Sequence, residues 1–168
     1  MCNTGHNWYA FYTYPNREKA AYNELMKTGH DVFLPVVKTI HRWQNRQQKN
    51  ISKVLFPGYI FVRTVESEIY NIAQISQIVR CVKCGDRPAV VPERDIRCIQ
   101  LMLDMGQEVY KTHDFIEGEH VKVVRGPLAG YKGILVKRKG KSRFCLQLND
   151  IGQCACIDIG ASMLEKVR

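Results

Sequence analysis

Short runs of alternating apolar and polar residues, interrupted by Gly and Pro, run through the N-terminal two thirds of the chain. These runs predict strands at 8–14, 31–40, 53–64 and 78–84. Apolar residues at helical spacing predict helices after Asn16, over 69–76 and from Pro92 to Gly106. We expect Asn16 to cap the first helix and Gly29 to end it. This order of elements predicts an α+β domain, with a mostly antiparallel sheet flanked by helices.

The segment 54–62, with the sequence VLFPGYIFV, is apolar on both faces of the strand that it predicts. In it, Leu55, Tyr59 and Phe61 alternate with Phe56, Ile60 and Val62. One face can pack against the helices as core. The other face needs a cover, which another helix, a neighbouring domain or a partner could supply.

The C-terminal part of the chain is rich in strand-forming residues and glycines. The stretch 118–133, GEHVKVVRGPLAGYKG, predicts a strand and a turn, with corners at Gly130 and Gly133 where glycine permits positive φ or close backbone approach. The strands expected here cover 119–125, 133–139, 143–148, 154–159 and 164–167. Together they predict a small five-stranded β-barrel over residues 118–168. Residues 107–117 lack apolar periodicity, so we expect a linker between this barrel and a first domain over 1–106.

The chain of 168 residues carries a formal net charge of +9, and its cations are clustered. No acidic residue occurs between Lys38 and Lys53, or between His120 and Asn149. Runs of a single sign favour contact with nucleic-acid phosphates. The alternative is that both runs are solvated hairpin tips, kept soluble by their charge.

Seven cysteines and the lack of a signal peptide or an apolar run long enough to cross a bilayer predict a cytoplasmic protein with reduced thiols. The odd number argues against a closed disulfide framework. Cys81 and Cys84 have C-x-x-C spacing, but no second pair of ligands accompanies them, so we expect no metal. Cys154 and Cys156 are expected on one face of a strand. No catalytic motif is present, and we expect neither enzymatic activity nor a cofactor.

The order of these elements, together with LFPGYIFV and VKVVRGPLAGYKG, resembles the NusG-type transcription elongation factors over nearly the whole chain. The first part resembles the family's N-terminal domain, and the second resembles its SH3-like KOW domain. The leading WYAFYTYP and the acid-free segment 41–53 are more similar to the specialised paralogues, which are RfaH-like factors and antiterminators of polysaccharide gene clusters.

The resemblance implies that the first domain binds the clamp helices of RNA polymerase through an apolar patch and suppresses pausing or termination. Carried over by position, the patch is Tyr12, Tyr59, Phe61, Cys84, Ile96 and Ile99. The alternative is that these six residues belong to the core. The resemblance also implies a monomeric protein associated with the bacterial nucleoid, with no membrane partner.

Upstream or non-template DNA is a second implied partner. It would face Arg42, Arg46, Lys49 and Lys53, through phosphate contacts that carry little sequence information. Arg17 is a further implied nucleic-acid residue, near the first helix, where specialised paralogues read sequence, and we assign it no base contact. The KOW domain would bind a small-subunit ribosomal protein through the loop Asn149, Asp150, Ile151, Gly152 and Gln153. Ile151 stands where the housekeeping factor has an aromatic residue, which weakens the case for binding the termination factor Rho. Val123, Val124 and Ile134 favour a stable barrel over the helical hairpin that RfaH can form.

Two other functions use the same features. KOW barrels also occur in RNA-binding ribosomal proteins, although those lack the LFPGYIFV domain. An adaptor that joins polymerase to the ribosome without antitermination activity would use the same surfaces. A transcription assay with a defined terminator separates this adaptor from an antiterminator.

Overall fold

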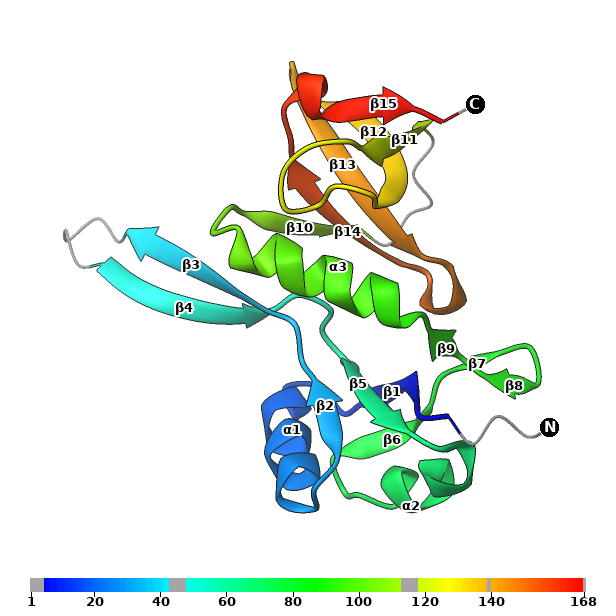
Figure 1. Ribbon diagram of the computed structural model, residues 1–168. Helices are drawn as coiled ribbons and strands as arrows, with labels where there is room; N and C mark the ends of the chain where they lie inside the picture. The colour runs from blue at the N-terminus through cyan, green and yellow to red at the C-terminus, as the bar shows by residue number, and fades with distance from the viewer. Residues whose placement is uncertain (1–4, 43–47, 113–117, 139, 168) are drawn as a thin grey trace. The chain divides into compact units, whose positions relative to one another are not determined.

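The computed structural model describes residues 5–42, 48–112, 118–138 and 140–167 (Figure 1). Two compact units interleave along the chain. The first unit is Met1–Leu34 with Phe56–Ile96 and Leu148–Ile151, and the second is Pro35–Leu55 with Arg97–Gln147 and Gly152–Arg168. Helices together with antiparallel sheets confirm the α+β class. The predicted domain boundaries at 106 and 118 stay a prediction.

An antiparallel sheet forms the centre of the first unit. Its strands are β1 (Asn7–Thr13), β2 (Asp31–Phe33), β5 (Tyr59–Thr64), β6 (Ile78–Cys81) and β9 (Val90–Val91). They are ordered β2-β5-β1-β6, with β9 also paired to β1. Two very short strands, β7 (Lys83–Cys84) and β8 (Arg87–Pro88), pair separately. Strands β1 and β5 are in register from Asn7 opposite Thr64 to Tyr12 opposite Tyr59, which fixes the residues that share a face.

Three α-helices match the helices predicted from apolar spacing. They are α1 (Glu18–Lys27), α2 (Ile69–Ala73), which follows the 3-10 turn η1 (Glu66–Glu68), and α3 (Glu93–Asp104). Gly29 follows α1 with a φ of +81°, as expected. The predicted cap is wrong, because Arg17 precedes α1 and makes no side-chain capping bond. Asn16 instead takes a φ of 60° in a tight turn, in which the Arg17 N–H donates to the Tyr14 carbonyl at 3.0 Å.

One face of the first sheet packs against helices α1 and α2. The core on this face consists of Tyr9, Phe11, Ala21, Leu25, Val32, Ile60, Val62, Ile72, Ile78 and Cys81. Ile60 and Val62 come from β5, as the predicted alternation requires, while Ala21 and Leu25 lie one helical turn apart on α1. The expectation that helices cover one of the two apolar faces is therefore confirmed.

A six-stranded antiparallel sheet forms most of the second unit. Its strands are β10 (Val109–Thr112), β11 (Glu119–Val123), β12 (Lys132–Arg138), β13 (Lys141–Leu148), β14 (Gln153–Asp158) and β15 (Leu164–Lys166), in the order β10-β14-β13-β12-β11-β15. Two 3-10 turns, η2 (Asn149–Ile151) and η3 (Ala161–Met163), connect the last strands. All five predicted strands are present, so these residues form strands and not a helical hairpin.

Strand β10 is the sixth strand, and it lies where the sequence predicts a linker. It pairs with β14 from Val109 opposite Ile157 to Thr112 opposite Cys154, and the Val109 side chain is buried. A single buried valine leaves no periodicity for a sequence pattern to detect, and backbone hydrogen bonds hold the rest of the strand. Residues 113–117 of the predicted linker lie outside the described residues.

Strands β3 (Val36–Arg42) and β4 (Gln48–Val54) form a hairpin in the second unit. The strand predicted over 31–40 is therefore two strands, β2 and β3, which are separated at Pro35. Proline has no N–H to donate to a ladder, and the Pro35 carbonyl instead accepts from the Leu55 N–H at 2.8 Å. The predicted tip, 44–50, is shorter than expected because 48–50 belong to β4, and 44–47 lie outside the described residues.

The structure contains a disulfide, whereas the sequence led us to expect reduced thiols. Cys145 and Cys156 are joined as a disulfide between β13 and β14, with their Cα atoms 4.1 Å apart. Neighbouring strands bring the two residues face to face, which the number of cysteines cannot reveal. The C-x-x-C thiols lie in different surroundings, since Cys84 is exposed whereas burial raises the pKa of Cys81 to about 11.

Arg143 connects three strands of the C-terminal sheet. Its Nε donates to Asp158 Oδ1 at 2.8 Å, and its guanidinium lies 3.9 Å from the centre of the Tyr110 ring. Only 17% of the Arg143 side chain is exposed, so both interactions are partly shielded from water. We expect Arg143→Met to lower the free energy of unfolding of this sheet by about 2 kcal/mol, measured by urea denaturation.

A matched control is the ion pair between Lys166 and Glu119, which is also short, at 2.9 Å, but has a Lys166 side chain that is 73% exposed. Water and salt screen such a pair, so Lys166→Met is expected to leave stability unchanged. Equal losses in the two variants would show that the shielding of Arg143 has no effect.

Candidate functional site

The Phe56–Tyr59 turn positions the start of β5. Pro57 and Gly58 are its central residues, the φ of Gly58 is +82°, and the Tyr59 N–H donates to the Phe56 carbonyl at 3.1 Å. Proline followed by a residue with positive φ is the requirement of a type II turn. The sequence therefore dictates this turn locally.

Both backbone polar groups of Gly58 are hydrogen-bonded. Its N–H donates to Glu18 Oε1 at 2.8 Å, and its carbonyl accepts from the Thr13 N–H at 2.9 Å. Glu18 is a buried carboxylate in the first turn of α1, and it was not identified from the sequence. Helix α1 and strand β1 together thus determine where Tyr59 begins its strand.

An aromatic face lies on the side of the sheet away from the α1 and α2 core. We define it as Trp8, Tyr12, Phe33, Phe56, Tyr59 and Phe61. Ring contacts with centroid separations of 6.1 to 6.4 Å connect Trp8, Phe33, Phe61 and Phe56, while Tyr12 and Tyr59 form a separate pair at 5.0 Å. Tyr59 and Phe61 share this face, as predicted. Phe56 was expected on the other face, but it packs edge-on against Phe61 because the Phe56–Tyr59 turn breaks the alternation.

The six predicted patch residues differ in how far they are accessible. Tyr12 and Tyr59 are half-buried, with ring centres 5.0 Å apart, and Cys84 is exposed. Phe61, Ile96 and Ile99 are buried. Their assignment to a binding patch stays a prediction. Among these six residues, Tyr12 and Tyr59 supply the accessible aromatic surface.

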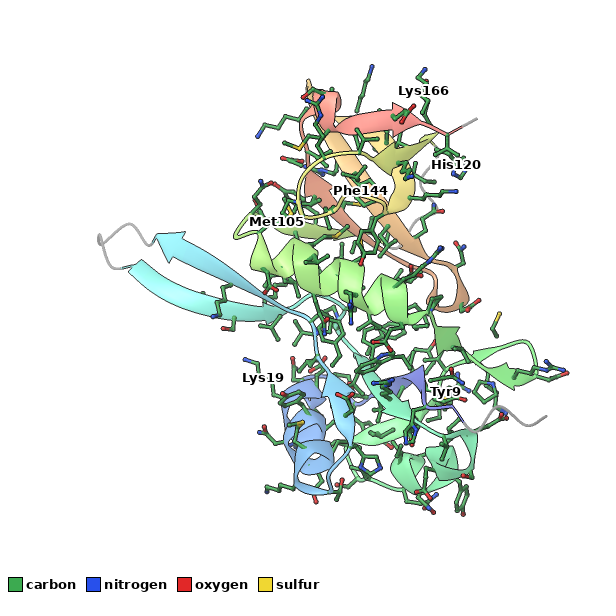
Figure 2. The ribbon with its side chains drawn as sticks, in the orientation of Figure 1. Tyr9, Lys19, Met105, His120, Phe144 and Lys166 are labelled. Carbon is green, nitrogen blue, oxygen red and sulfur yellow. A yellow bond between two sulfur atoms is a disulfide. The ribbon has the colours of Figure 1, made fainter. Side chains whose placement is uncertain are left out.

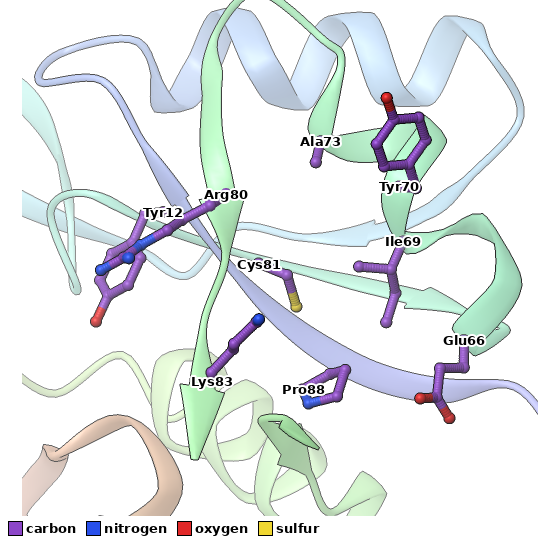
Figure 3. Close-up of a pocket in the computed structure, with 9 residues that line it drawn as sticks. All are labelled: Tyr12, Glu66, Ile69, Tyr70, Ala73, Arg80, Cys81, Lys83 and Pro88. Carbon is purple, nitrogen blue, oxygen red and sulfur yellow. The ribbon is translucent and has the colours of Figure 1, made fainter. Parts of the chain in front are cut away.

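Arg80 extends this pair, although no sequence motif singled it out. It is opposite Tyr12 in the β1–β6 register, and its guanidinium lies 5.5 Å from the centre of the Tyr12 ring (Figure 3). Both residues line a pocket of about 550 Å³ with Glu66, Ile69, Tyr70, Ala73, Cys81, Lys83 and Pro88. Pairing between strands that are distant in sequence creates this surface, which explains why sequence spacing missed it.

The other end of β1 is held by polar contacts. Trp8 Nε1 donates to Glu93 Oε2 at 2.9 Å, and Arg63 approaches both Glu93 and Asp31 at 3.7 and 3.8 Å. The Trp8 ring therefore has a fixed orientation beside Phe33.

The predicted nucleic-acid residues are only partly described. Arg17 is exposed just before α1, and Lys53 is exposed on β4, opposite Val37. Arg42 and Lys49 occupy backbone positions in the β3–β4 hairpin, whereas Arg46 lies outside the described residues.

Lys111, on β10, is a basic residue that the sequence reading did not select. Burial lowers its pKa, and the positive charge of Lys53 lowers it further. Two ammonium groups close enough to repel one another favour an anion beside them.

The predicted partner loop contains the turn η2. Asn149 and Asp150 are exposed, Ile151 and Gln153 are buried, and Gly152 has a φ of +63°. The amide oxygen of Gln153 is buried and has no hydrogen-bond partner. The accessible part of the loop Asn149–Gln153 is therefore smaller than the sequence indicated.

Neither a metal site nor a membrane-spanning segment is found in the described part of the chain. No three His, Cys, Asp or Glu residues are grouped there as potential metal ligands. None of its helices has the length and apolar character needed to cross a bilayer.

Comparison with known proteins shows similarity to NusG proteins. Residues 6–100 match the family model described as transcription termination factor nusG. The chain is 24% identical to the transcription termination/antitermination protein NusG of Halalkalibacterium halodurans and 26% identical to that of Campylobacter jejuni, covering 96% of this chain and 98% of each relative. A solved structure of Thermotoga maritima NusG superimposes with a TM-score of 0.52, at 21% identity and over 97% of this chain and 98% of that one. That structure supports the fold.

Proposed function

Since the chain belongs to the NusG family of transcription termination and antitermination factors, we propose that it binds the clamp helices of RNA polymerase and suppresses pausing or termination. Members of this family are transcription factors and not enzymes. The observation that carries the proposal is the sheet with two apolar faces, of which one is filled by α1 and α2. The other presents the Tyr12 and Tyr59 rings with Arg80 beside them.

This composition suits a helical protein partner. Tyrosine rings supply contact area while their hydroxyl groups tolerate a wet rim, and tyrosine and arginine are enriched where interfaces depend on a few residues. Arg80 adds a charge that an acidic side chain of a partner can meet. We therefore infer that Tyr12, Tyr59 and Arg80 are the centre of the contact, with Cys84 at its edge.

DNA and a ribosomal protein complete the proposal. The β3–β4 hairpin, which carries Lys53, is proposed to meet the phosphates of upstream or non-template DNA together with Lys111 of β10. The loop Asn149–Gln153 is proposed to bind a small-subunit ribosomal protein. The exposed Asn149 and Asp150 are suited to polar contacts there.

Elongation in vitro with RNA polymerase from the source organism tests the main proposal. On a template with a pause site and a defined terminator, the protein is expected to shorten the pause and increase readthrough. If it binds polymerase but changes neither quantity on any template, the result favours the adaptor function over antitermination. If it does not bind polymerase, the proposal fails.

Salt dependence tests the DNA contact. Lys53→Gln is expected to reduce by about 1 the slope of log affinity against log salt concentration for a DNA oligonucleotide, because one phosphate contact is lost. Lys27→Gln removes the same charge from an exposed position at the end of α1 and should leave the slope unchanged. Fluorescence anisotropy over a salt series measures both variants. Equal slopes for Lys53→Gln and the unchanged protein would contradict the contact.

A further inference from the structure

Three cysteines form one cluster on the C-terminal sheet. Cys145 of β13 and Cys154 and Cys156 of β14 are all buried, and Tyr110 and Val136 pack against them. Cys154 and Cys156 lie on one strand face, as the sequence predicts. Cys145 and Cys156 are bonded through their sulfur atoms, whereas Cys81 and Cys84 of the same chain are not disulfide-bonded. In a reducing compartment, which the sequence predicts for this protein, disulfides are usually transient and catalytic or redox-sensing.

The bonded cysteines bracket the loop Asn149–Gln153. They are 11 residues apart in sequence, and this interval holds the ends of β13 and β14 as well as the turn η2. A covalent link across the base of a hairpin limits how far the connecting loop can open. The chemical state of these two residues therefore bears on the loop proposed above as a partner-binding site.

We propose that Cys145 and Cys156 are a reversible dithiol/disulfide site that sets how readily the hairpin carrying Asn149–Gln153 opens. The oxidant is a small-molecule disulfide such as oxidised glutathione. The thiolate of one cysteine attacks it, forms a mixed disulfide and releases one glutathione thiol. The thiolate of the other cysteine then attacks the mixed disulfide and releases the second glutathione. Two protons leave the cysteines and two electrons pass to glutathione.

Both cysteines are almost inaccessible, which determines the rate of the exchange. Cys145 is fully buried and 3% of Cys156 is exposed, so a reagent reaches them only when strands β13 and β14, which lie inside the sheet, open locally. Exchange in the folded protein is therefore slow, and the link persists once it has formed. The effect of this disulfide on partner binding rests on the proposed function. The thiol–disulfide exchange and the opening of the hairpin do not depend on that function.

Peptide mapping of the full chain tests the chemistry. After treatment with oxidised glutathione, mass spectrometry is expected to find a peptide that links Cys145 to Cys156, and dithiothreitol should remove it. Cys154→Ala, which changes the third cysteine of the cluster, should still form the link. Absence of the linked peptide after oxidation, or a link through Cys154 instead, overturns the proposal.

Hydrogen exchange and thermal melting test whether the disulfide limits the opening of the hairpin. Backbone amides between the two cysteines are expected to exchange at least about tenfold faster in the reduced protein, and its melting temperature should be lower by about 10 °C. The double variant Cys145→Ala/Cys156→Ala should match the reduced protein under both oxidising and reducing conditions. If oxidised and reduced protein exchange and melt alike, the proposal fails.

Binding to purified small ribosomal subunits is measured separately in both redox states. A difference in affinity between the two states supports control of the partner by the link. Equal affinity in the two states would show that the disulfide does not regulate partner binding and that it affects only the hairpin. No binding in either state refutes the proposed partner, while the hydrogen-exchange result still decides the redox site.

Discussion

Replacing both Tyr12 and Tyr59 with alanine is expected to weaken binding to RNA polymerase by one to two orders of magnitude. The two rings touch each other, with centres 5.0 Å apart, and Arg80 lies over Tyr12. Losses at two residues in contact are not additive, so truncating the pair is expected to cost about 2 kcal/mol in total, which corresponds to roughly a thirtyfold loss of affinity. Removal of Tyr12 also leaves the guanidinium of Arg80 without its ring contact. Biolayer interferometry with core polymerase, at fixed salt concentration, measures the change.

Two controls separate this effect from unfolding. Tyr12→Phe/Tyr59→Phe keeps both rings and should bind within about threefold of the unchanged protein, because little apolar area is lost. Met26→Ala removes an apolar side chain that is 49% exposed on α1, the helix that packs on the opposite face of the sheet, and should leave affinity unchanged. The core beneath α1 and α2 includes neither Tyr12 nor Tyr59, so the melting temperature should fall only slightly. Unchanged affinity in the folded double alanine variant would exclude the tyrosine pair as the contact.

A Gly133→Val variant is expected to lose the folded C-terminal sheet. A Cβ atom at Gly133 would lie 2.6 Å from the Cys145 carbonyl oxygen and 2.6 Å from Cε2 of Phe144. Phe144, which is labelled in Figure 2, is fully buried. The strand and the ring would both have to move, at a cost of about 3 kcal/mol or more. Circular dichroism and the dispersion of amide signals in nuclear magnetic resonance spectra report the loss.

Gly160→Ala is the matched control for this effect. Its φ is not positive, and its added Cβ would meet only the Ser162 hydroxyl at 3.8 Å, which is an ordinary contact. Alanine reduces the freedom of the unfolded chain, so stability should be unchanged or rise by about 0.5 kcal/mol. A well-folded Gly133→Val protein would show that the sheet can accommodate a side chain at this position.

The glycine corners illustrate how far residue pattern alone reaches. Gly130 and Gly133 were both predicted as corners that need positive φ or close backbone approach. Gly130 has a φ of +93°, whereas Gly133 has no positive φ and is required by the proximity of β13 and Phe144. The sequence therefore indicated the need for glycine, while the physical reason at each position depended on the neighbouring strands.

Pairing between separate strands accounts for most of what the sequence did not reveal. The Cys145 and Cys156 link, the strand β10 and the position of Arg80 over Tyr12 all arise from strand neighbours. Glu18 belongs to the same class, because its carboxylate serves a peptide group that is 40 residues away in sequence. None of these leaves a periodic signal within its own segment.

By itself, the sequence determined the local elements of this protein: the Pro57-Gly58 turn, the end of α1 at Gly29, the helix after Pro92 and five of the six strands of the C-terminal sheet. These depend on backbone preferences and on spacing within one segment, which neighbouring residues settle. Only the tertiary structure decided which aromatic rings of the first sheet are accessible. Burial is a property of three-dimensional packing, and strands that are apolar on both faces carry no mark of which face the helices will cover.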